Sequence, residues 1–195
     1  KKFSRGKRGV ILKGIYEQKN VAIKYMRPDT DSVNPINRET RILDFLRNEG
    51  IDFIPEVIMT GKDYFVYEFI DAKLLGEWID CSIKKDILQV LNKILLDCKQ
   101  LDELGLIKEE MHRPHRHIFV LPDKNIKWID FERCHETDSP KNVTQFIQYI
   151  TSTDITKKLL NKKVMIDNEK IRKLSAAYKR SYSDKTFENI KECIA

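Results

Sequence analysis

The sequence predicts an α+β fold in two parts, an antiparallel sheet with one helix followed by a mostly helical part. Two patterns indicate this division. Short apolar runs separated by turn residues occupy the first part, and apolar residues at helical spacing dominate the second. With 195 residues, the chain is long enough to bury a core without disulfide or metal cross-links. We expect the first part to cover residues 1–72 and the second 73–195.

In the first part, two pairs of strands are expected around one helix. Polar or glycine-bearing turns separate the members of each pair. The apolar runs lie at 10–16, 21–26, 53–59 and 64–70. Between the pairs, apolar residues from Ile36 to Leu46 share one helical face, and Gly50 follows them. This segment is therefore predicted to be an amphipathic helix.

In the second part, a long helical stripe runs from Ile87 to Leu101 and ends near Gly105. A hairpin is expected next, because two short apolar runs flank a turn of Pro, Asp, Lys and Asn. These runs lie at 118–120 and 126–129. From Val143 onward the pattern predicts two or three helices.

Composition limits the class of protein only broadly. The net charge of +6 favours partners that carry phosphate, such as nucleotides, nucleic acid or acidic headgroups. The four cysteines lie far apart, which predicts reduced thiols, and no apolar run approaches the roughly 18 residues of a membrane helix. We expect a cytoplasmic protein without a membrane span.

A glycine-bearing segment opens the chain. Residues 4–11 follow the pattern G-x-G-x-x-G-x-V, with Ser4 at the first glycine and Ile11 at the valine. Glycines at Gly6 and Gly9 would let backbone amides approach phosphate oxygens, and Lys7 adds positive charge. The alternative interpretation is an ordinary glycine turn.

Residues 21–24 read Val-Ala-Ile-Lys, the strand whose lysine contacts the α- and β-phosphates in kinases. A lysine in an apolar strand must reach the sheet edge or an anionic partner, because burying a bare ammonium is costly. Glu39, in the helix that follows, is the expected partner of Lys24. Alternatively, Glu39 is a surface carboxylate.

The predicted second hairpin leads into Asp130-Phe131-Glu132, where a kinase carries Asp-Phe-Gly. Asp130 would bind the magnesium ion that bridges the phosphates. Because Glu132 replaces the glycine, this loop is less free to reach positive φ. The alternative is an aspartate that only caps the next turn.

Together these motifs resemble the protein kinase superfamily over roughly residues 3–150. A hinge-like Tyr-Glu-Phe-Ile segment at 67–70 is part of this resemblance. The short second half, the missing Ala-Pro-Glu segment and the sequence at 129–133 resemble the small atypical members, including RIO-type, lipopolysaccharide-kinase-like and predicted archaeal Ser/Thr kinases. The resemblance implies a two-lobed kinase-like fold that binds ATP and Mg²⁺. It implies nucleotide contacts at Ser4, Gly6, Lys7, Gly9, Ile11, Ala22, Lys24, Glu39, Glu68 and Ile70.

The His-Arg-Asp triplet of ordinary kinases is absent, and two alignments of residues 106–118 remain open. One places Glu110 at the catalytic aspartate, and the other places His112 there and His117 at the metal-binding asparagine. We favour Glu110 as the base, with Arg113 or Arg116 stabilising the transferring phosphoryl group and His117 contacting magnesium or phosphate. Three nearby histidines also allow zinc, but the arginines among them would repel a cation.

The leading hypothesis is therefore an atypical Ser/Thr-kinase-like phosphotransferase. It would move the γ-phosphoryl group of ATP to a protein hydroxyl or a small hydroxylated substrate. A pseudokinase, in which bound nucleotide only holds a conformation that a partner reads, is the second hypothesis. A basic nucleic-acid-binding module is the third, and its binding should weaken steeply with salt. Against it, the aromatic residues do not alternate with the basic ones.

Overall fold

The computed structural model describes residues 2–5, 9–26 and 35–194. The chain divides into two compact units. Unit 1 contains Lys1–Asp71 and Lys127–Arg133, and unit 2 contains Ala72–Ile126 and Cys134–Ala195. The chain thus leaves unit 1 after Asp71, returns to it for seven residues, and leaves it again. Its first boundary lies one residue before the expected one, whereas 127–133 was expected in the second part.

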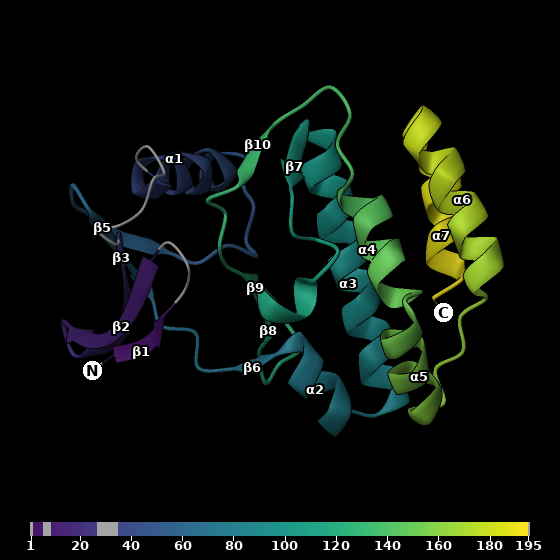
Figure 1. The fold of residues 1–195 in the computed structure, drawn as a ribbon, viewed down its shortest axis with the longest axis horizontal. Coiled ribbons are helices and arrows are strands. Elements are labelled where there is room, and N and C mark those ends of the chain that lie inside the picture. Colours follow the sequence, from purple (N-terminus) through teal and green to yellow (C-terminus); the bar gives the residue numbers. More distant parts are fainter. Residues whose placement is uncertain (1, 6–8, 27–34, 195) are drawn as a thin grey trace. The chain divides into compact units, whose positions relative to one another are not determined.

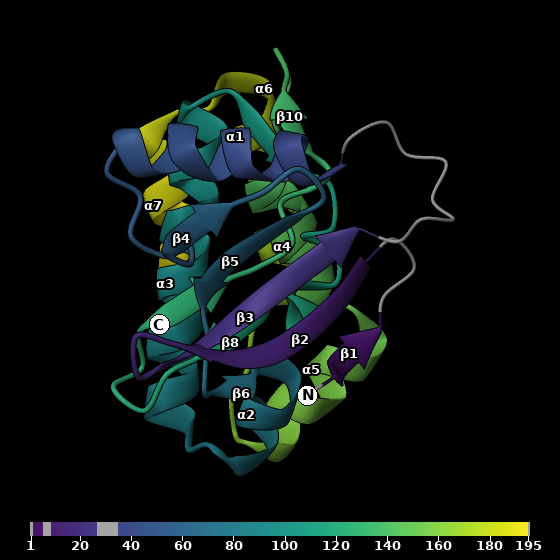
Figure 2. The same cartoon turned by 90° about the vertical axis from the view of Figure 1, so that its left-hand side faces the viewer.

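Unit 1 is built on a five-stranded antiparallel sheet with strand order β1-β2-β3-β5-β4 (Figure 2). The strands are β1 (Lys2–Arg5), β2 (Gly9–Tyr16), β3 (Lys19–Met26), β4 (Val57–Thr60) and β5 (Tyr64–Glu68). Glu17 and Gln18 both have positive φ in the two-residue turn between β2 and β3. This geometry matches the right-handed twist of the paired strands. The turn has two residues, whereas a polar turn over residues 17–20 was expected.

Helix α1 (Pro35–Asn48) packs on this sheet (Figure 1). Gly50 ends it with a φ of 76°, and its N–H donates to the Arg47 carbonyl at 3.0 Å. The N–H of Ile51 donates to the Leu46 carbonyl at 3.0 Å, and both side chains are buried. Glycine fits this left-handed C-terminal position because it has no Cβ.

The returning segment 127–133 contributes two large side chains to the core of unit 1. Trp128 and Phe131 are fully buried, and the Trp128 ring lies 4.8 Å from that of Phe53. The Trp128 N–H also donates to the Phe53 carbonyl at 2.7 Å. Phe53 precedes β4 rather than belonging to it, so the expected strand 53–59 begins late, and Pro55, which has no N–H to donate, lies in the gap.

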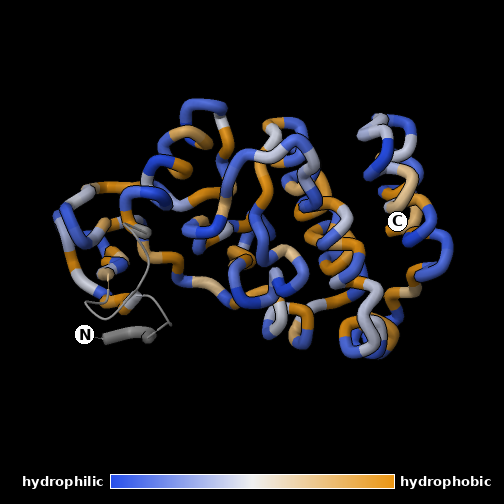
Figure 3. Tube along the Cα trace, turned by 45° about the horizontal axis from the view of Figure 1, so that its top comes forward, coloured by the Kyte–Doolittle hydropathy of each residue, from blue (hydrophilic) through white to orange (hydrophobic). Residues whose placement is uncertain are grey.

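Unit 2 is mostly helical, as expected. Its helices are α2 (Leu75–Cys81), α3 (Lys84–Glu103), α4 (Asn142–Ile150), α5 (Thr153–Asn161), α6 (Asn168–Ser181) and α7 (Asp184–Glu192). Helix α3 packs against α4, α4 against α6, and α6 against α7 (Figure 1). Hydrophobic and hydrophilic residues alternate along these helices in Figure 3, as helices with one buried face require.

Short strands complete unit 2. Strand β6 (Lys73–Leu74) pairs with β8 (Ile118–Val120), and β7 (Leu106–Lys108) pairs with β10 (Cys134–Glu136). The 3₁₀ helix η1 (Pro114–Arg116) precedes β8, and β9 (Ile126–Trp128) runs from unit 2 into unit 1. No helix within 35–194 has both the length and the apolar character needed to cross a bilayer.

A buried polar network holds the start of α4 in unit 2. The Asp102 carboxylate accepts hydrogen bonds from the Asn142 N–H at 2.9 Å and the Asn142 side-chain amide at 2.8 Å. Asn142 in turn accepts from the Lys108 N–H at 2.8 Å. Burial raises the pKa of Asp102 to about 6, although these donors favour its ionised form.

Candidate functional site

Lys24 lies in the middle of the unit 1 sheet. On β3 it faces Ile11 of β2 on one side and Phe65 of β5 on the other. Residues directly opposite in an antiparallel pair share a face of the sheet. Only 12% of the Lys24 side chain is exposed, so its amine needs anionic partners.

Glu39 on α1 is the closest partner. Its Oε2 lies 2.6 Å from Lys24 Nζ, and its side chain is 3% exposed. The other oxygen, Oε1, accepts a hydrogen bond from the Phe131 N–H at 3.0 Å. Glu39 therefore joins the strand that carries Lys24 to the backbone of the segment that carries Asp130. The surface position considered as an alternative for Glu39 is wrong.

Two more carboxylates approach the same amine. Asp130 Oδ1 lies 2.8 Å from Lys24 Nζ, and Glu132 Oε2 lies 3.6 Å from it. Asp130 is the more open of the two, with 31% of its side chain exposed against 13% for Glu132. One ammonium is thus surrounded by three carboxylates, all within unit 1.

Asp130 has a strained backbone. Its φ is 66°, in the left-handed region that residues with a Cβ rarely adopt. Glu132, at the position of the glycine in the kinase motif, is not among the described residues with positive φ. Such strain persists only where surrounding contacts hold it, and it is concentrated at functional sites. Here the ion pair with Lys24 holds the Asp130 side chain in place.

The charges in this cluster shift the pKa values of its members. Burial alone would lower the pKa of Lys24, but the charges of Glu39, Asp130 and Glu132 outweigh it and raise the pKa above its usual value. Burial raises the pKa of Glu39, and the neighbouring Lys24 ammonium opposes that shift. Lys24 is therefore a permanent cation at neutral pH, and Glu39 depends on it to stay ionised.

The three carboxylates could also hold a divalent cation. One oxygen each from Glu39, Asp130 and Glu132 lies within 4.8 Å of the others. Magnesium prefers oxygen ligands and is usually bound through one or two carboxylates plus phosphates. Since Glu39 already bonds Lys24 and the Phe131 N–H, Asp130 and Glu132 fit that role best.

Other predicted nucleotide contacts are distributed around Lys24. Ala22 lies on the same face of the sheet as Lys24, and Ile11 lies directly opposite Lys24 on β2. A Cβ at Gly9 would crowd the Tyr25 carbonyl oxygen at 3.2 Å, whereas it would only make ordinary contact with Lys24 Cε at 3.7 Å. Of the other predicted contacts in the glycine segment, Ser4 lies in β1, where only its backbone is described, and Gly6 and Lys7 lie outside the described residues.

The predicted hinge residues lie at the end of β5 and beyond it. Glu68 is the last residue of that strand, and its carboxylate lies 2.8 Å from Lys127 Nζ. It also accepts a hydrogen bond from the Glu56 N–H at 3.2 Å. Ile70 follows the strand and is half-buried. The structure therefore gives Glu68 a structural partner, whereas adenine contacts at 68 and 70 stay a prediction.

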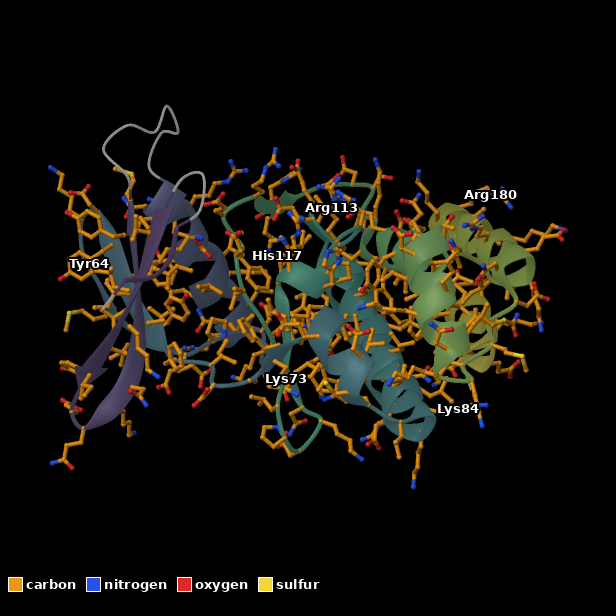
Figure 4. All side chains as sticks on the ribbon, turned by 60° about the horizontal axis from the view of Figure 1, so that its bottom comes forward. Tyr64, Lys73, Lys84, Arg113, His117 and Arg180 are labelled. Atoms are coloured by element: carbon orange, nitrogen blue, oxygen red, sulfur yellow. The ribbon has the colours of Figure 1, made fainter. Side chains whose placement is uncertain are left out.

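The candidate proton-transfer residues lie in unit 2, on the loop between β7 and β8. Glu110 and His117, proposed for different roles, contact each other with 3.1 Å between Oε2 and Nε2. His112 is exposed, and its Nδ1 lies 3.3 Å from the Glu109 carbonyl. Arg113 is exposed as well, and Figure 4 labels it together with His117.

The approach of Glu132 to Lys24 was not predicted. From the sequence, Glu132 was expected only to replace the glycine of the kinase motif. No local pattern reports this contact, because Asp130 has a φ of 66° and Glu132 lies in a turn, so the segment is not a strand in which residues two apart share a side.

No protein-family model matches the chain. An uncharacterized protein of Methanocaldococcus jannaschii is 32% identical over 116 residues, which cover 58% of this chain and 98% of that protein.

Proposed function

The chain belongs to the same family as this Methanocaldococcus jannaschii protein, and from the geometry of its site we propose that it binds ATP with Mg²⁺ and transfers the γ-phosphoryl group to a hydroxyl acceptor. The observation that carries the proposal is the position of the Lys24 amine, 2.6 Å from Glu39 and 2.8 Å from Asp130. An amine held by one carboxylate and adjacent to a second, more exposed one is suited to bind phosphate beside a metal ion.

A purely structural role explains this cluster less well. One carboxylate would neutralise the Lys24 ammonium, yet three surround it. Burying charges is costly, and well-packed apolar residues often serve stability equally well or better. The strained backbone of Asp130 adds a further cost. Three carboxylates gathered at one amine, at such a cost, favour a site that receives a cation.

In the proposed complex, Lys24 would bind phosphate oxygens while Glu39 holds its amine in place. Asp130 and Glu132 would hold magnesium, which would neutralise charge on the β- and γ-phosphates when bound. The resemblance to atypical protein kinases, carried by residues 21–24 and 130–131, supports ATP as the nucleotide. The acceptor would be a protein Ser/Thr hydroxyl or a small hydroxylated compound.

The proposal is tested by two measurements on the full chain. Titration calorimetry measures binding of MgATP, and γ-labelled ATP measures transfer to the protein itself and to a basic protein acceptor. We expect the wild-type chain to bind MgATP and to yield labelled product. Asp130→Asn should weaken the magnesium-dependent part of binding at least tenfold, because the carboxylate charge is lost.

Matched variants distinguish the role of the Lys24 site from the effect of the same substitution at an exposed position. Lys24→Arg keeps a positive charge beside Glu39 but replaces a compact ammonium by a planar guanidinium, so we expect binding without efficient transfer. Lys19→Arg, on the same strand but exposed, should behave as wild type. Asp123→Asn, in an exposed turn, is the control for Asp130.

Each result has a defined meaning. No heat of binding at millimolar MgATP would refute nucleotide binding and with it the whole proposal. Binding without labelled product, even with manganese and long incubation, would instead favour a nucleotide-dependent regulatory module. Binding of nucleic acid that weakens steeply with salt and survives Lys24→Ala would favour the basic nucleic-acid-binding alternative.

A further inference from the structure

Four elements of unit 2 meet around one pair of stacked rings. Helix α2 contacts η1 and α5, and α4 contacts α5 (Figure 1). The imidazole of His115 in η1 stacks on the ring of Tyr149 in α4, with 5.6 Å between the ring centroids and 18° between the planes. Gly76 allows α2 to approach η1 closely, because a Cβ there would crowd the Cβ of His115 at 3.3 Å. The ring pair therefore lies where elements of unit 2 converge.

Each ring carries a buried polar atom that the surrounding fold does not pair. Among the described residues, neither the Tyr149 hydroxyl nor Nδ1 of His115 has a hydrogen-bond partner. Tyr149 is only 3% exposed. Buried polar groups in folded proteins are nearly always hydrogen-bonded, because leaving one unpaired is costly. Two such atoms on stacked rings require an explanation.

Positive charge surrounds His115. Arg113 and Arg116 lie on either side of it in the sequence, and both are exposed. Neither arginine forms an ion pair within the part of the chain that the structure describes. Burial lowers the pKa of His115, and the charges of Arg116, Arg113 and Lys158 lower it further. Three cations therefore act on the same imidazole.

One of these cations already has an anionic partner. Lys158 of α5 donates to the Gly76 carbonyl at 3.1 Å and to Asp80 Oδ2 at 2.7 Å. Burial raises the pKa of Tyr149, and the Asp80 charge raises it further, so the phenol lies near this ion pair. Because Asp80 neutralises Lys158, the charges that a ligand could balance are those of the two arginines. A ligand with two negative charges would match them.

We propose that α2, η1, α4 and α5 form a binding site for a doubly charged oxyanion, either free phosphate or the phosphate group of a small phosphomonoester. The Tyr149 hydroxyl and the Nδ1–H form of His115 would donate hydrogen bonds to its oxygens, and Arg113 and Arg116 would supply the positive charge. The site belongs to unit 2 alone. It goes beyond the phosphotransferase function proposed for the Lys24 site and does not depend on it.

Titration calorimetry of the full chain with inorganic phosphate tests the site, with sodium chloride holding the ionic strength constant. Tyr149→Phe removes only the hydroxyl and should raise the Kd about tenfold or more, the effect of losing one hydrogen bond to a charged group. Arg113→Gln/Arg116→Gln should raise it about tenfold, because two charges are lost. Lys179→Gln/Arg180→Gln removes the same charge from exposed positions of α6, so the Kd should stay within about twofold of wild type.

Thermal unfolding distinguishes a ligand site from a structural hydroxyl. Without phosphate, Tyr149→Phe should unfold at the wild-type temperature or above it, because it removes a buried hydroxyl that no described residue pairs. With phosphate at about ten times its Kd, the wild type should unfold about 3–5 °C higher, and Tyr149→Phe should gain much less. A lower unfolding temperature of Tyr149→Phe without phosphate would show that the hydroxyl has a stabilising partner, and would overturn the inference.

Other anions identify the ligand. Tighter binding of glycerol phosphate than of inorganic phosphate would assign the site to a phosphomonoester, and the reverse order would assign it to the free ion. Acetate should bind at least about tenfold more weakly, because it carries one charge. Three results would overturn the site: no heat of binding at millimolar phosphate, equal affinity for acetate, or a wild-type Kd in both Tyr149→Phe and the double arginine variant. The last result would place the bound phosphate elsewhere, whatever the fate of MgATP at Lys24.

Discussion

Replacing Lys24 by methionine tests whether the ion cluster of unit 1 is assembled as described. Methionine has a similar length and removes the ammonium that Glu39 contacts at 2.6 Å. Glu39 would remain 3% exposed, with the Phe131 N–H as the donor described for its other oxygen. Asp130 and Glu132 would face it without the cation that now separates their charges.

The expected loss is large. Removing one partner of a buried ion pair leaves an uncompensated charge and costs about 3–5 kcal/mol in free energy of unfolding. Lys24→Met/Glu39→Gln should recover roughly 2 kcal/mol of this, because glutamine still accepts from the Phe131 N–H without a buried charge. Lys19→Met, exposed on the same strand, should change stability by less than about 0.5 kcal/mol.

The loss should also depend on pH. Burial raises the pKa of Glu39, and removing Lys24 takes away the interaction that opposes this shift. A carboxyl whose folded pKa is raised binds more protons in the folded state above its ordinary pKa of about 4.3. Stability therefore falls as pH rises through that window. The Lys24→Met penalty should be smaller at pH 5 than at pH 8.

Urea unfolding followed by tryptophan fluorescence measures this effect in unit 1. Of the two tryptophans, Trp128 is fully buried in unit 1 and Trp78 lies in α2 of unit 2. A Trp78→Phe background therefore leaves Trp128 as the reporter of unit 1. A loss below about 1 kcal/mol at pH 7.5, or an equal loss at pH 5 and pH 8, would refute the reasoning.

Two further predictions concern stability. The pKa of Asp102, raised by burial to about 6, means that its ionisation lowers stability by about 3 kcal/mol in total as pH rises from about 4 to above 6. Asp102→Asn should flatten that slope in urea unfolding followed by circular dichroism, and an unchanged slope would contradict the assignment. Gly50→Ala should lower the free energy of unfolding by about 1–2 kcal/mol, because φ is 76° at this position. No atom lies within 4 Å of an added Cβ, so the cost comes from the backbone alone. A neutral result would show that the helix end rearranges.

Local patterns predicted most of the elements. Short apolar runs flanked by turn residues predicted β2, β3 and β5, and apolar residues at helical spacing predicted α1 and α3. Helix α2 was missed because it has only seven residues and follows the short strand β6 directly. Strands β7 and β10 have three residues each and pair across a long stretch of chain, so no local pattern reports their pairing.

The site was predictable only where a local motif carried it. The Lys24–Glu39 contact followed from the strand-then-helix order of the kinase motif, and it is present. The contact of Glu110 with His117 was not foreseen, because the sequence does not show that the loop turns back on itself through successive hydrogen bonds. The roles of these residues toward ATP stay predictions.

The return of the chain to unit 1 at 127–133 affects how this unit can form during synthesis. A ribosome that has released only the first 71 residues has delivered Lys24 and Glu39, but neither Asp130 nor the Trp128 ring that packs on Phe53. All of Ala72–Ile126 must emerge before that gap is filled. A gene fragment that stops at residue 71 would encode an unfinished core, so excising the sheet alone is a poor strategy for isolating the lysine site.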